Sequence, residues 1–552
     1  MQFAPAPFPP GAAREYQRAG YHTGMGLPQL MRRTVAEFGP LCAVADGGRT
    51  LTWEELLGHA FCLAGFLEAQ GIGAGDVVVW QMPNWWEALV VAYGVWAAGA
   101  VSAPVVPIYR EHELANVLQA VEPRCVLAPL RFRGHDHVAA MEAAIDLWGG
   151  NPLRVVVRGS AAGWTGFDDV LAGAPFSATL VDPDAPALVG FTSGTTSGAK
   201  AVVMSTRGLL VVPLRHARTV PYTWHDRGYM AASVSHATGL LMAVTIPLVS
   251  GCSVVLADRW DPARAVEEIQ QHSVTYTGGA AVFMQELADA VVAASLPSLP
   301  LSTGFSAGGS PIPTELARRC EELGMKPRRA YGMTECPTVS ASLPGDPTWV
   351  RLATDGRVLP GCEVKVVAPG RPGGVLGPGQ VGEFLVRGPQ RALGYVDPVH
   401  TAEAFDDAGW LRTGDLGTVD ASGCLTVSGR TKDVINRGGE KLSAREIEEL
   451  IAGHPEVVEA AVVALPHPRL GEEPAAFVIA RGAAPSEEEL AGFLRARGLA
   501  PQKIPRVWIT LADLPRTPSG KVKKYELVER LRASRTPQPP AAPATDLDVG
   551  SG

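Results

Sequence analysis

From about residue 50 onward, apolar residues alternate between segments of helix length and segments of strand length. Segment 52–72, TWEELLGHAFCLAGFLEAQGI, has apolar residues at helical spacing and ends at glycine, which predicts a helix. The fully apolar start of VVVWQM (77–82) predicts a short strand covered on both faces. Strands separated by helices are typical of a parallel sheet with crossover helices. After a helix at 85–100, further strands are predicted at 101–106, 124–128, 154–158, 187–191, 229–234 and 252–257.

The apolar segment 85–108, WWEALVVAYGVWAAGAVSAPVVPI, is long enough to suggest a membrane span. Glu87 lies near its start, however, and Pro104 and Pro107 interrupt its end. We therefore expect a buried helix to about Ala100, then a short strand, and no membrane insertion.

The pattern changes after about residue 340, where glycine and proline become dense. The short β-rich runs at 363–367 and 382–386 predict a small barrel or antiparallel sheet. From about 430 a smaller α+β domain is predicted, with helices at 443–455 and 486–498 and strands at 457–466 and 473–480.

Composition narrows the classes of function. A chain of 552 residues suggests two to four domains, because single cores stop growing at roughly 250 to 300 residues. A formal charge of -8 without a basic run argues against nucleic acid or anionic lipid as a partner. Small molecules or other proteins are the expected partners.

Eight cysteines are scattered without a C-x-x-C pair, which argues against a disulfide framework or a zinc site. The amino terminus lacks a basic segment followed by an apolar core, so no secretory signal is expected. Both observations predict a cytoplasmic protein.

The loop FTSGTTSGAK (191–200) is rich in small hydrogen-bond donors. Gly194 and Gly198 let the backbone aim N–H groups at one point, and Lys200 adds a positive charge, so the loop suits phosphate. A solvated polar turn is the alternative. The P-loop pattern does not fit, because Ala199 stands five residues after Gly194 and no Ser or Thr follows Lys200. The candidate hydroxyl donors are Thr192, Ser193, Thr195, Thr196 and Ser197.

Three later motifs add to this picture. YGMTE (331–335) combines an aromatic ring, a glycine, a hydroxyl and a carboxylate, which could stack on a base, donate to a phosphate and hold magnesium. WLRTGDLG (410–417) places Asp415 on a tight turn, where its carboxylate could accept both hydroxyls of a ribose. PRTPSGKVKK (515–524) presents Lys521 on a turn punctuated by Pro and Gly. Each motif alone also fits an ordinary turn or a surface salt bridge.

In this order the motifs resemble the adenylate-forming (ANL) superfamily of acyl-CoA synthetases, peptide-synthetase adenylation domains and beetle luciferases, over roughly residues 27–532. Further matches are SHATG (235–239), SAGGSPIP (306–313) and SGRTKDVINRGGEKLSAREIEE (428–449). MPNWWEALVV and PIYREHEL resemble cyclohexanecarboxylate-type CoA ligases, close to medium-chain ones.

The resemblance implies an α/β fold. A large N-terminal adenylation domain (1–429) would hold two layered α/β subdomains and a small β-barrel. A mobile α+β C-terminal domain (430–532) would follow, and the Pro/Ala-rich tail 533–552 is expected to be disordered.

The resemblance also implies roles for individual residues. Thr334 would contact the α-phosphate of ATP, Glu335 would help to hold Mg²⁺, and Lys521 would bridge the substrate carboxylate and the α-phosphate. His236 matches a histidine that gates the acyl pocket or lies beside the carboxylate, with a structural histidine as the alternative. The remaining nucleotide-binding residues are Thr192, Ser193, Gly194, Thr195, Thr196 and Lys200 for the phosphates, Gly308, Gly309 and Tyr331 beside the adenine, and Asp415 and Arg430 at the ribose. Ser310, Gly332, Met333 and Val427 are also expected to bind the nucleotide.

For coenzyme A, the resemblance implies a tunnel for the pantetheine arm lined by Gly438, Gly439 and Glu440, with a plain turn as the alternative. Lys432 matches the hinge about which the small domain rotates, so that one site serves two reactions. The phosphate loop departs from the family, which has Gly, Pro and Gly where this chain has Ser197, Ala199 and Ala201.

The expected activity is that of an AMP-forming acyl-CoA synthetase that uses ATP, Mg²⁺ and coenzyme A. Small residues in YTGGAAVF (276–283) and SAGGS (306–310) suggest a bulky alicyclic, polycyclic or aromatic acid. The alternatives are an adenylating enzyme that loads a carrier protein and a non-catalytic nucleotide-binding relative. Homodimer formation stays open.

Overall fold

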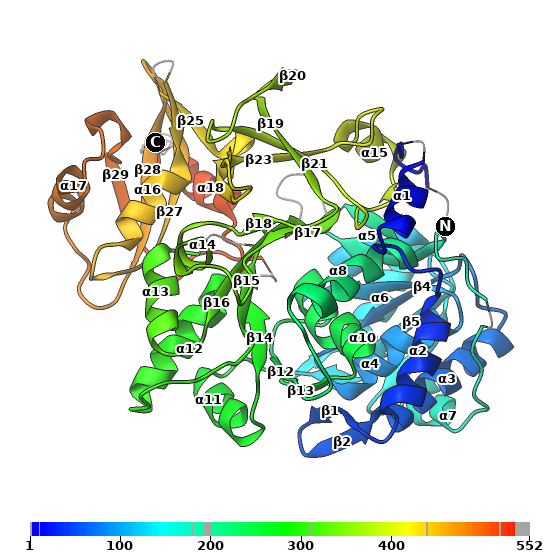
Figure 1. Cartoon of the computed structure of the whole chain (residues 1–552). Helices are drawn as coiled ribbons and strands as arrows, with labels where there is room; N and C mark the ends of the chain where they lie inside the picture. Colours follow the sequence, from blue (N-terminus) through cyan, green and yellow to red (C-terminus); the bar gives the residue numbers. More distant parts are fainter. Residues whose placement is uncertain are drawn as a thin grey trace, which may run out of the picture. The chain divides into compact units, whose positions relative to one another are not determined.

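The computed structural model describes residues 3–9, 11–178, 180–192, 200–309, 312–437, 440–517 and 520–535. The chain forms two compact units (Figure 1). The first comprises residues 1–432 together with 516–521, and the second comprises 433–515 and the residues from 522 onward. The first division falls directly after Lys432. Each unit has cores of its own, so each is described by itself.

The first unit begins with an eight-stranded sheet. From β4 to β9 its neighbouring strands run parallel, as predicted, whereas β10–β11 and β11–β22 are antiparallel. The strand order is β22 (Gly394–Tyr395), β11 (Ala201–Ser205), β10 (Pro186–Phe191), β4 (Val101–Val105), β3 (Val77–Gln81), β5 (Cys125–Pro129), β8 (Leu153–Val157) and β9 (Thr165–Gly166).

Successive residues of β3 face different layers, as a strand covered on both faces requires. Val78 and Trp80 belong to a core shared with α3 (Trp53–Ala69) and α4 (Trp86–Ala97). Val77 and Val79 belong to a core shared with α5 (Glu111–Val121) and α6 (His137–Trp148). The prediction of a buried strand at 77–82 is therefore confirmed.

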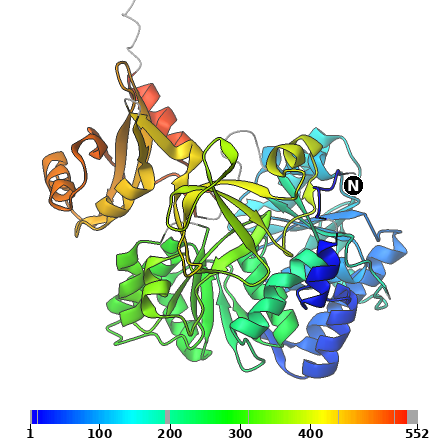
Figure 2. The same cartoon turned by 45° about the horizontal axis from the view of Figure 1, so that its top comes forward.

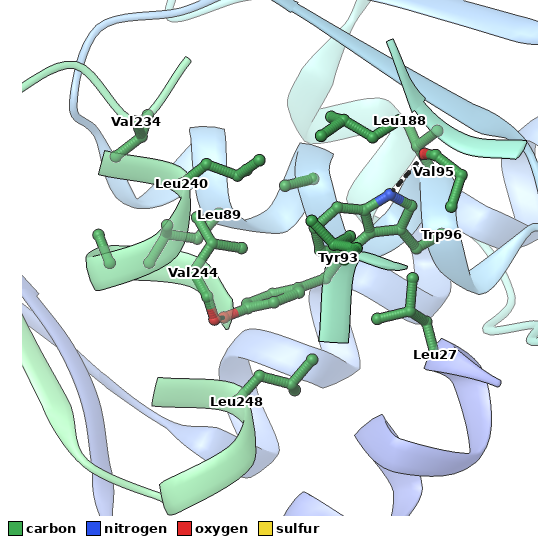
Figure 3. Packing of buried hydrophobic residues seen from close by; sticks show 14 of the residues in the cluster. Leu27, Leu89, Tyr93, Val95, Trp96, Leu188, Val234, Leu240, Val244 and Leu248 are labelled. Atoms are coloured by element: carbon green, nitrogen blue, oxygen red, sulfur yellow. Dashed lines mark hydrogen bonds between the residues drawn. The ribbon is translucent and has the colours of Figure 1, made fainter. Parts of the chain in front are cut away.

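Helix α4 is buried at every position because it contacts strands of both large sheets. The Tyr93 hydroxyl donates to the Val244 carbonyl oxygen at 2.8 Å, and Trp96 Nε1 donates to the Ala187 carbonyl oxygen at 2.9 Å (Figure 3). The expected buried helix and short strand in segment 85–108 are confirmed as α4 and β4. Among the described helices, none combines the length and apolar character that crossing a membrane requires.

The second sheet has nine strands. Its centre, from β16 to β1, is parallel, while β2, β17 and β18 add antiparallel edges. The order is β18 (Arg357–Val358), β17 (Cys336–Ala341), β16 (Pro327–Met333), β15 (Gly304–Gly308), β14 (Tyr276–Gly279), β12 (Arg227–Met230), β13 (Ser253–Leu256), β1 (Cys42–Asp46) and β2 (Arg49–Thr52).

The prediction of a strand at 229–234 is wrong beyond Met230, where β12 ends. The buried side chain of Asn84 binds the backbone of the next residues instead. Its Nδ2 donates to the carbonyl oxygens of Met230 and Ala232 at 3.2 and 3.0 Å, and its Oδ1 accepts from Val234 N at 2.9 Å. These bonds take the place of a strand ladder and let the chain turn away.

The region after residue 360 forms a five-stranded antiparallel sheet where the small barrel or sheet was predicted. Its strands are, in order, β20 (Arg371–Val375), β19 (Glu363–Ala368), β21 (Gly382–Arg387), β23 (Leu411–Val419) and β24 (Leu425–Arg430). The remaining elements of this unit are α1 (Ala12–Arg18), α2 (Leu27–Phe38), β6 (Arg131–Phe132), β7 (His135–Asp136), α7 (Phe167–Leu171), α8 (Thr206–Thr219), α9 (Ala237–Gly239), the π-helix η1 (Leu240–Thr245), α10 (Ile246–Ser250), α11 (Pro262–Gln271), α12 (Ala281–Ala293), α13 (Thr314–Glu322), α14 (Thr348–Ala353), α15 (Pro398–Ala404) and the 3-10 helix η2 (Thr431–Asp433), whose last residue starts the second unit.

The second unit is a five-stranded sheet covered on both faces (Figure 2). Val462 of β27 packs with α16 (Ala444–Ala452) and α17 (Glu487–Ala496), whereas Ala461 and Val463 pack with α18 (Lys524–Arg535). Its other elements are β25 (Val434–Arg437), β26 (Glu440–Ser443), β27 (Val457–His467), β28 (Gly471–Ala480), η3 (Pro501–Lys503) and β29 (Val507–Thr510).

The predicted helices and strands of this unit are confirmed. Helix α18 extends to Arg535, so the tail expected to be disordered from 533 is helical over its first three residues. The rest of that tail, 536–552, lies outside the described residues.

Candidate active site

The candidate site lies where four parallel strands of the nine-stranded sheet end. Strands β12, β14, β15 and β16 run parallel, so their carboxyl ends lie at one edge of the sheet, which is where open α/β sheets bind ligands. His236 follows β12, and Gly309 follows β15. Thr334 and Glu335 follow β16. Four predicted site residues are thereby brought to one edge.

Glycine is required at several positions of this edge. A Cβ on Gly332 would lie 2.3 Å from Thr338 N, and a Cβ on Gly308 would lie 2.8 Å from the Ala330 carbonyl oxygen. Gly309 has φ of 80°, in the left-handed region that favours glycine. The predicted nucleotide-binding positions 308 and 332 are therefore tightly packed and cannot carry larger side chains without moving.

The predicted phosphate loop connects β10 to β11, two strands that pair antiparallel as a hairpin. Thr192 N donates to the Lys200 carbonyl oxygen at 3.0 Å, and Lys200 N donates to Thr192 Oγ1 at 3.3 Å, so this pair closes the loop. Several predicted residues lie outside the described residues, namely Ser193, Gly194, Thr195, Thr196, Ser197, Ala199, Ser310, Gly438 and Gly439.

The hairpin reaches Thr334 and Glu335. A Cβ on Gly190 of β10 would lie 2.9 Å from Thr334 Cγ2. Tyr395 of β22 pairs with Val202 of β11 and donates to Glu335 Oε1 at 2.5 Å. Lys200 Nζ lies 5.7 Å from the centre of the Tyr395 ring and 4.0 Å from Glu403 Oε2. Tyr395 therefore connects the carboxylate to the base of the loop.

Tyr395 was missed by the sequence analysis. It stands 60 residues after Glu335 in LGYVDP, where no local pattern indicates a partner. Only the pairing of β22 with β11 brings the phenol to the carboxylate.

The carboxylate of Asp415 is buried and holds two partners. Its Oδ2 accepts from the Tyr331 hydroxyl at 2.9 Å, and its Oδ1 accepts from Arg430 Nε at 2.7 Å. Burial first, and then the Asp415 charge, raise the pKa of Tyr331 well above its ordinary value, so Tyr331 stays a neutral donor. Val427, on the same strand as Arg430, donates its N–H to Asp355 Oδ2 at 2.9 Å.

Lys521 lies on the 516–521 segment, which belongs to the first unit. Its N–H donates to Thr517 Oγ1 at 3.1 Å, and its Cε lies 3.5 Å from the position of a Cβ on Gly309. Burial is the main effect that lowers the pKa of Lys521, and the positive charges of Arg430 and Lys432 lower it further. The negative charges of Asp415 and Glu335 act in the opposite direction and raise it. The predicted lysine is thus electrostatically coupled to the predicted ribose and magnesium residues.

The positive charge of the same lysine acts on His236. Burial first, and then the positive charge of Lys521, lower the pKa of His236 to about 4, so the imidazole is neutral at pH 7. His236 precedes α9, which continues into the π-helix η1, and the Tyr93 hydroxyl holds the Val244 carbonyl of that helix. Such π-turns occur often at functional sites.

The small residues near the expected acyl pocket are already packed. A Cβ on Gly278 would lie 2.4 Å from Met242 Sδ, and a Cβ on Gly279 would lie 3.0 Å from Phe283 Cδ2. These glycines therefore make room for Met242 and Phe283 of the protein itself.

Two predicted residues lie at or beyond the boundary of the first unit. Lys432 closes the main segment of the first unit, which is where a hinge was expected. Glu440 is exposed on β26 of the second unit. No group of three or more His, Cys, Asp or Glu side chains that could hold a metal occurs among the described residues.

Comparison with known proteins identifies the class. Residues 31–396 match the AMP-binding enzyme family, and residues 446–521 match the AMP-binding enzyme C-terminal domain. The chain therefore belongs to the family of AMP-binding enzymes, the adenylate-forming superfamily.

Relatives include acyl-CoA ligases. The chain is 33% identical to the medium-chain fatty-acid–CoA ligase of Escherichia coli K12, over 93% of this chain and 91% of that protein. It is 33% identical to the salicylyl-CoA synthase / salicylate adenylyltransferase of a Streptomyces species, over 95% and 97%. The ATP-bound crystal structure of MatB from Rhodopseudomonas palustris superposes with a TM-score of 0.83 at 27% identity, covering 93% of this chain and all of that one.

Proposed function

We propose that this protein is an AMP-forming acyl-CoA synthetase. The observation that carries the proposal is the convergence of Lys521, Asp415 and Glu335 at the edge where the phosphate-loop hairpin meets the nine-stranded sheet. A lysine and two carboxylates thereby interact electrostatically in one partly desolvated site. Such groups suit the binding of a nucleoside triphosphate and of a substrate carboxylate.

In the first step, a carboxylate oxygen of the acid attacks the α-phosphorus of ATP. A carboxyl-to-phosphorus bond forms, the bond from the α-phosphorus to its bridging oxygen breaks, and pyrophosphate leaves with that oxygen. Two anions must approach each other, so we assign Lys521 to offset their charge and Thr334 to donate to the α-phosphate. Buried Asp415 would hold the ribose, with Tyr331 and Arg430 fixing its orientation.

Glu335 fits a magnesium site of the kind completed by the substrate. Mg²⁺ is usually bound by one or two carboxylates together with substrate phosphates, which matches a single carboxylate beside the loop hairpin. When bound, the ion would neutralise phosphate charge, and Tyr395 would orient the Glu335 carboxylate.

In the second step, the thiolate of coenzyme A attacks the acyl carbon of the adenylate, the thioester forms, and AMP leaves. We assign the approach of the pantetheine arm to Gly438, Gly439 and Glu440, and the hinge to Lys432, as the family pattern implies. A phosphopantetheinylated carrier protein is the second candidate acceptor.

We propose an apolar alicyclic or aromatic acid as the substrate. The apolar side chains of Met242 and Phe283, which lie against the glycines at the end of β14, support this. The names of the two relatives, which include a fatty acid and salicylate, are compatible with an apolar pocket. The eight unpaired cysteines support a reducing, cytoplasmic location.

The deciding experiment measures pyrophosphate release from ATP with a panel of alkyl, alicyclic, aromatic and polycyclic acids. AMP release is then compared with free coenzyme A and with a phosphopantetheinylated carrier protein. We expect pyrophosphate release only when an acid is present. If no acid of the panel gives pyrophosphate release, the protein binds nucleotide without this activity.

A further inference from the structure

A cavity of about 180 Å³ lies in the first unit, apart from the candidate active site. It is lined by the residues after α1, by α8 from Val211 onward and by Pro360. None of the residues that line it belongs to the predicted site. They are Ala19, Gly20, Tyr21, Val211, Leu214, Arg215, Arg218, Thr219 and Pro360.

The cavity carries two positive charges and no negative one. Arg215 and Arg218 stand three residues apart on α8 and therefore on one face of that helix, and none of the lining residues is acidic. The nearby carboxylate of Glu363 is already held by Arg387, through bonds of 2.9 and 2.8 Å. The described residues that line the cavity therefore include no carboxylate to balance these two charges.

Arg215 is the deep cation, with 4% of its surface exposed. Its Nη1 donates to Cys362 Sγ at 3.2 Å and its Nη2 donates to Gln390 Oε1 at 3.0 Å, so neither recorded acceptor is a carboxylate. Its buried Nε has no hydrogen-bond partner among the described residues. A buried guanidinium without a carboxylate is costly, and an anion in the cavity would offset that cost.

Arg218 is the outer cation. Its Nη1 and Nη2 lie 3.2 Å from the position of a Cβ on Gly20, and Gly20 has φ of 75°. Glycine at this position therefore leaves space for the guanidinium beside the backbone. Arg218 is exposed, as a residue at the mouth of a cavity would be.

The rest of the lining is largely apolar, from Val211, Leu214, Tyr21 and Pro360. Its volume is below the roughly 300 Å³ at which pockets for drug-sized ligands begin, so it excludes a nucleotide. We propose that this cavity binds a small amphipathic anion, a short-chain carboxylate whose head group meets Arg215 and Arg218 and whose chain contacts Leu214 and Val211. This site is separate from the adenylation site and does not depend on the proposed function.

The test is isothermal titration of the full-length protein with sodium hexanoate, at constant ionic strength. Hexan-1-ol serves as the uncharged probe of equal length, and sodium phosphate as the anion without an apolar chain. We expect hexanoate to bind with a Kd of about 1 mM or tighter, and both other probes to bind at least tenfold more weakly. Equal binding of either probe, or no binding of hexanoate, would overturn the proposal.

Two variants locate the ligand without touching the hydrogen bonds of Arg215. Arg218→Gln removes the outer charge and is expected to weaken hexanoate binding about tenfold, because a charge-assisted bond is lost. Leu214→Trp fills the cavity and is expected to abolish binding. Arg259→Gln, which changes an exposed arginine outside the cavity lining, is the matched control and should bind as the wild type does.

The adenylation site could also bind a carboxylate, so Lys521→Ala completes the set. Hexanoate binding that persists in Lys521→Ala and is lost in Leu214→Trp supports the cavity. Binding that is lost in Lys521→Ala and persists in both cavity variants places the ligand in the adenylation site and overturns the proposal. Unliganded melting temperatures close to that of the wild type confirm that each variant is folded.

Discussion

The hydroxyl of Tyr395 donates a 2.5 Å hydrogen bond to Oε1 of Glu335, which joins a strand beside the phosphate-loop hairpin to the carboxylate proposed to hold magnesium. Hydrogen bonds to charged groups contribute about 1.5–3 kcal/mol. The orientation of Glu335 therefore depends on a residue outside every motif that points to nucleotide binding.

The first prediction concerns this contact. Tyr395→Phe leaves Glu335 without its phenol donor, so we expect the Mg²⁺ concentration for half-maximal pyrophosphate release to rise roughly tenfold. Tyr525→Phe, which removes an exposed phenol from the second unit, is the control. A magnesium curve that is identical in Tyr395→Phe and the wild type would contradict the assigned orientation of Glu335.

Lys521→Ala should remove the cation that offsets the approach of carboxylate and phosphate. We expect adenylation to fall by about 10² to 10³, while thioester formation from supplied acyl-adenylate continues. Lys523→Ala is the neighbouring control, because Lys523 Nζ bonds Glu526 of the second unit at 2.8 Å. Equal loss of both half-reactions in Lys521→Ala would argue against separate states for the two steps.

Gly439→Trp should give the opposite result. Gly439 lies outside the described residues, and the family pattern assigns its slim backbone to the pantetheine path. We expect normal pyrophosphate release and strongly reduced coenzyme A-dependent AMP release. Unchanged turnover with coenzyme A would reject the tunnel assignment.

Gly332→Ala tests the packing of the nucleotide edge. Its Cβ would lie 2.3 Å from Thr338 N, so the backbone must shift between Tyr331 and Thr334. A displacement of about 1 Å in such groups can reduce the rate roughly 10²-fold. Gly345→Ala, with nothing within 4 Å of its Cβ position, should keep wild-type activity and melting temperature. Wild-type kinetics in Gly332→Ala would show that the backbone at this edge of the sheet accepts the extra methyl group without loss of activity.

The pH dependence of stability follows from His236. Its folded pKa of about 4 lies below the ordinary value of 6.5, so the unfolded chain binds more protons between these values. This residue therefore makes stability rise with pH from about 4 to 6.5 and contributes no slope above that window. In His236→Gln we expect the melting temperature to depend less steeply on pH across this window. His137 and His216, whose pKa values are also lowered, still contribute to the pH dependence. An unchanged slope in the variant would contradict the burial of His236 beside Lys521.

The sequence by itself determined most elements, because local periodicity reports which face of each helix or strand is buried. Helix α4 and strand β4 follow directly from the apolar segment 85–108. The motifs around Tyr331 and Asp415 were likewise visible as sequence, although the tight turn predicted at Asp415 is wrong, because Asp415 lies within strand β23 and pairs with Arg430 of β24. Their residue types are those expected for contacts to phosphate and ribose, and this expectation does not depend on distant contacts.

Only the tertiary structure decided which of these groups meet. The end of β12 depends on Asn84, which comes from a segment well over 100 residues earlier. Tyr395 reaches Glu335 through strand pairing, and Met242 fills the space over Gly278 that the family resemblance and the small residues suggested for a substrate. These are contacts between residues far apart in the chain, and hydrophobic periodicity carries no information about them.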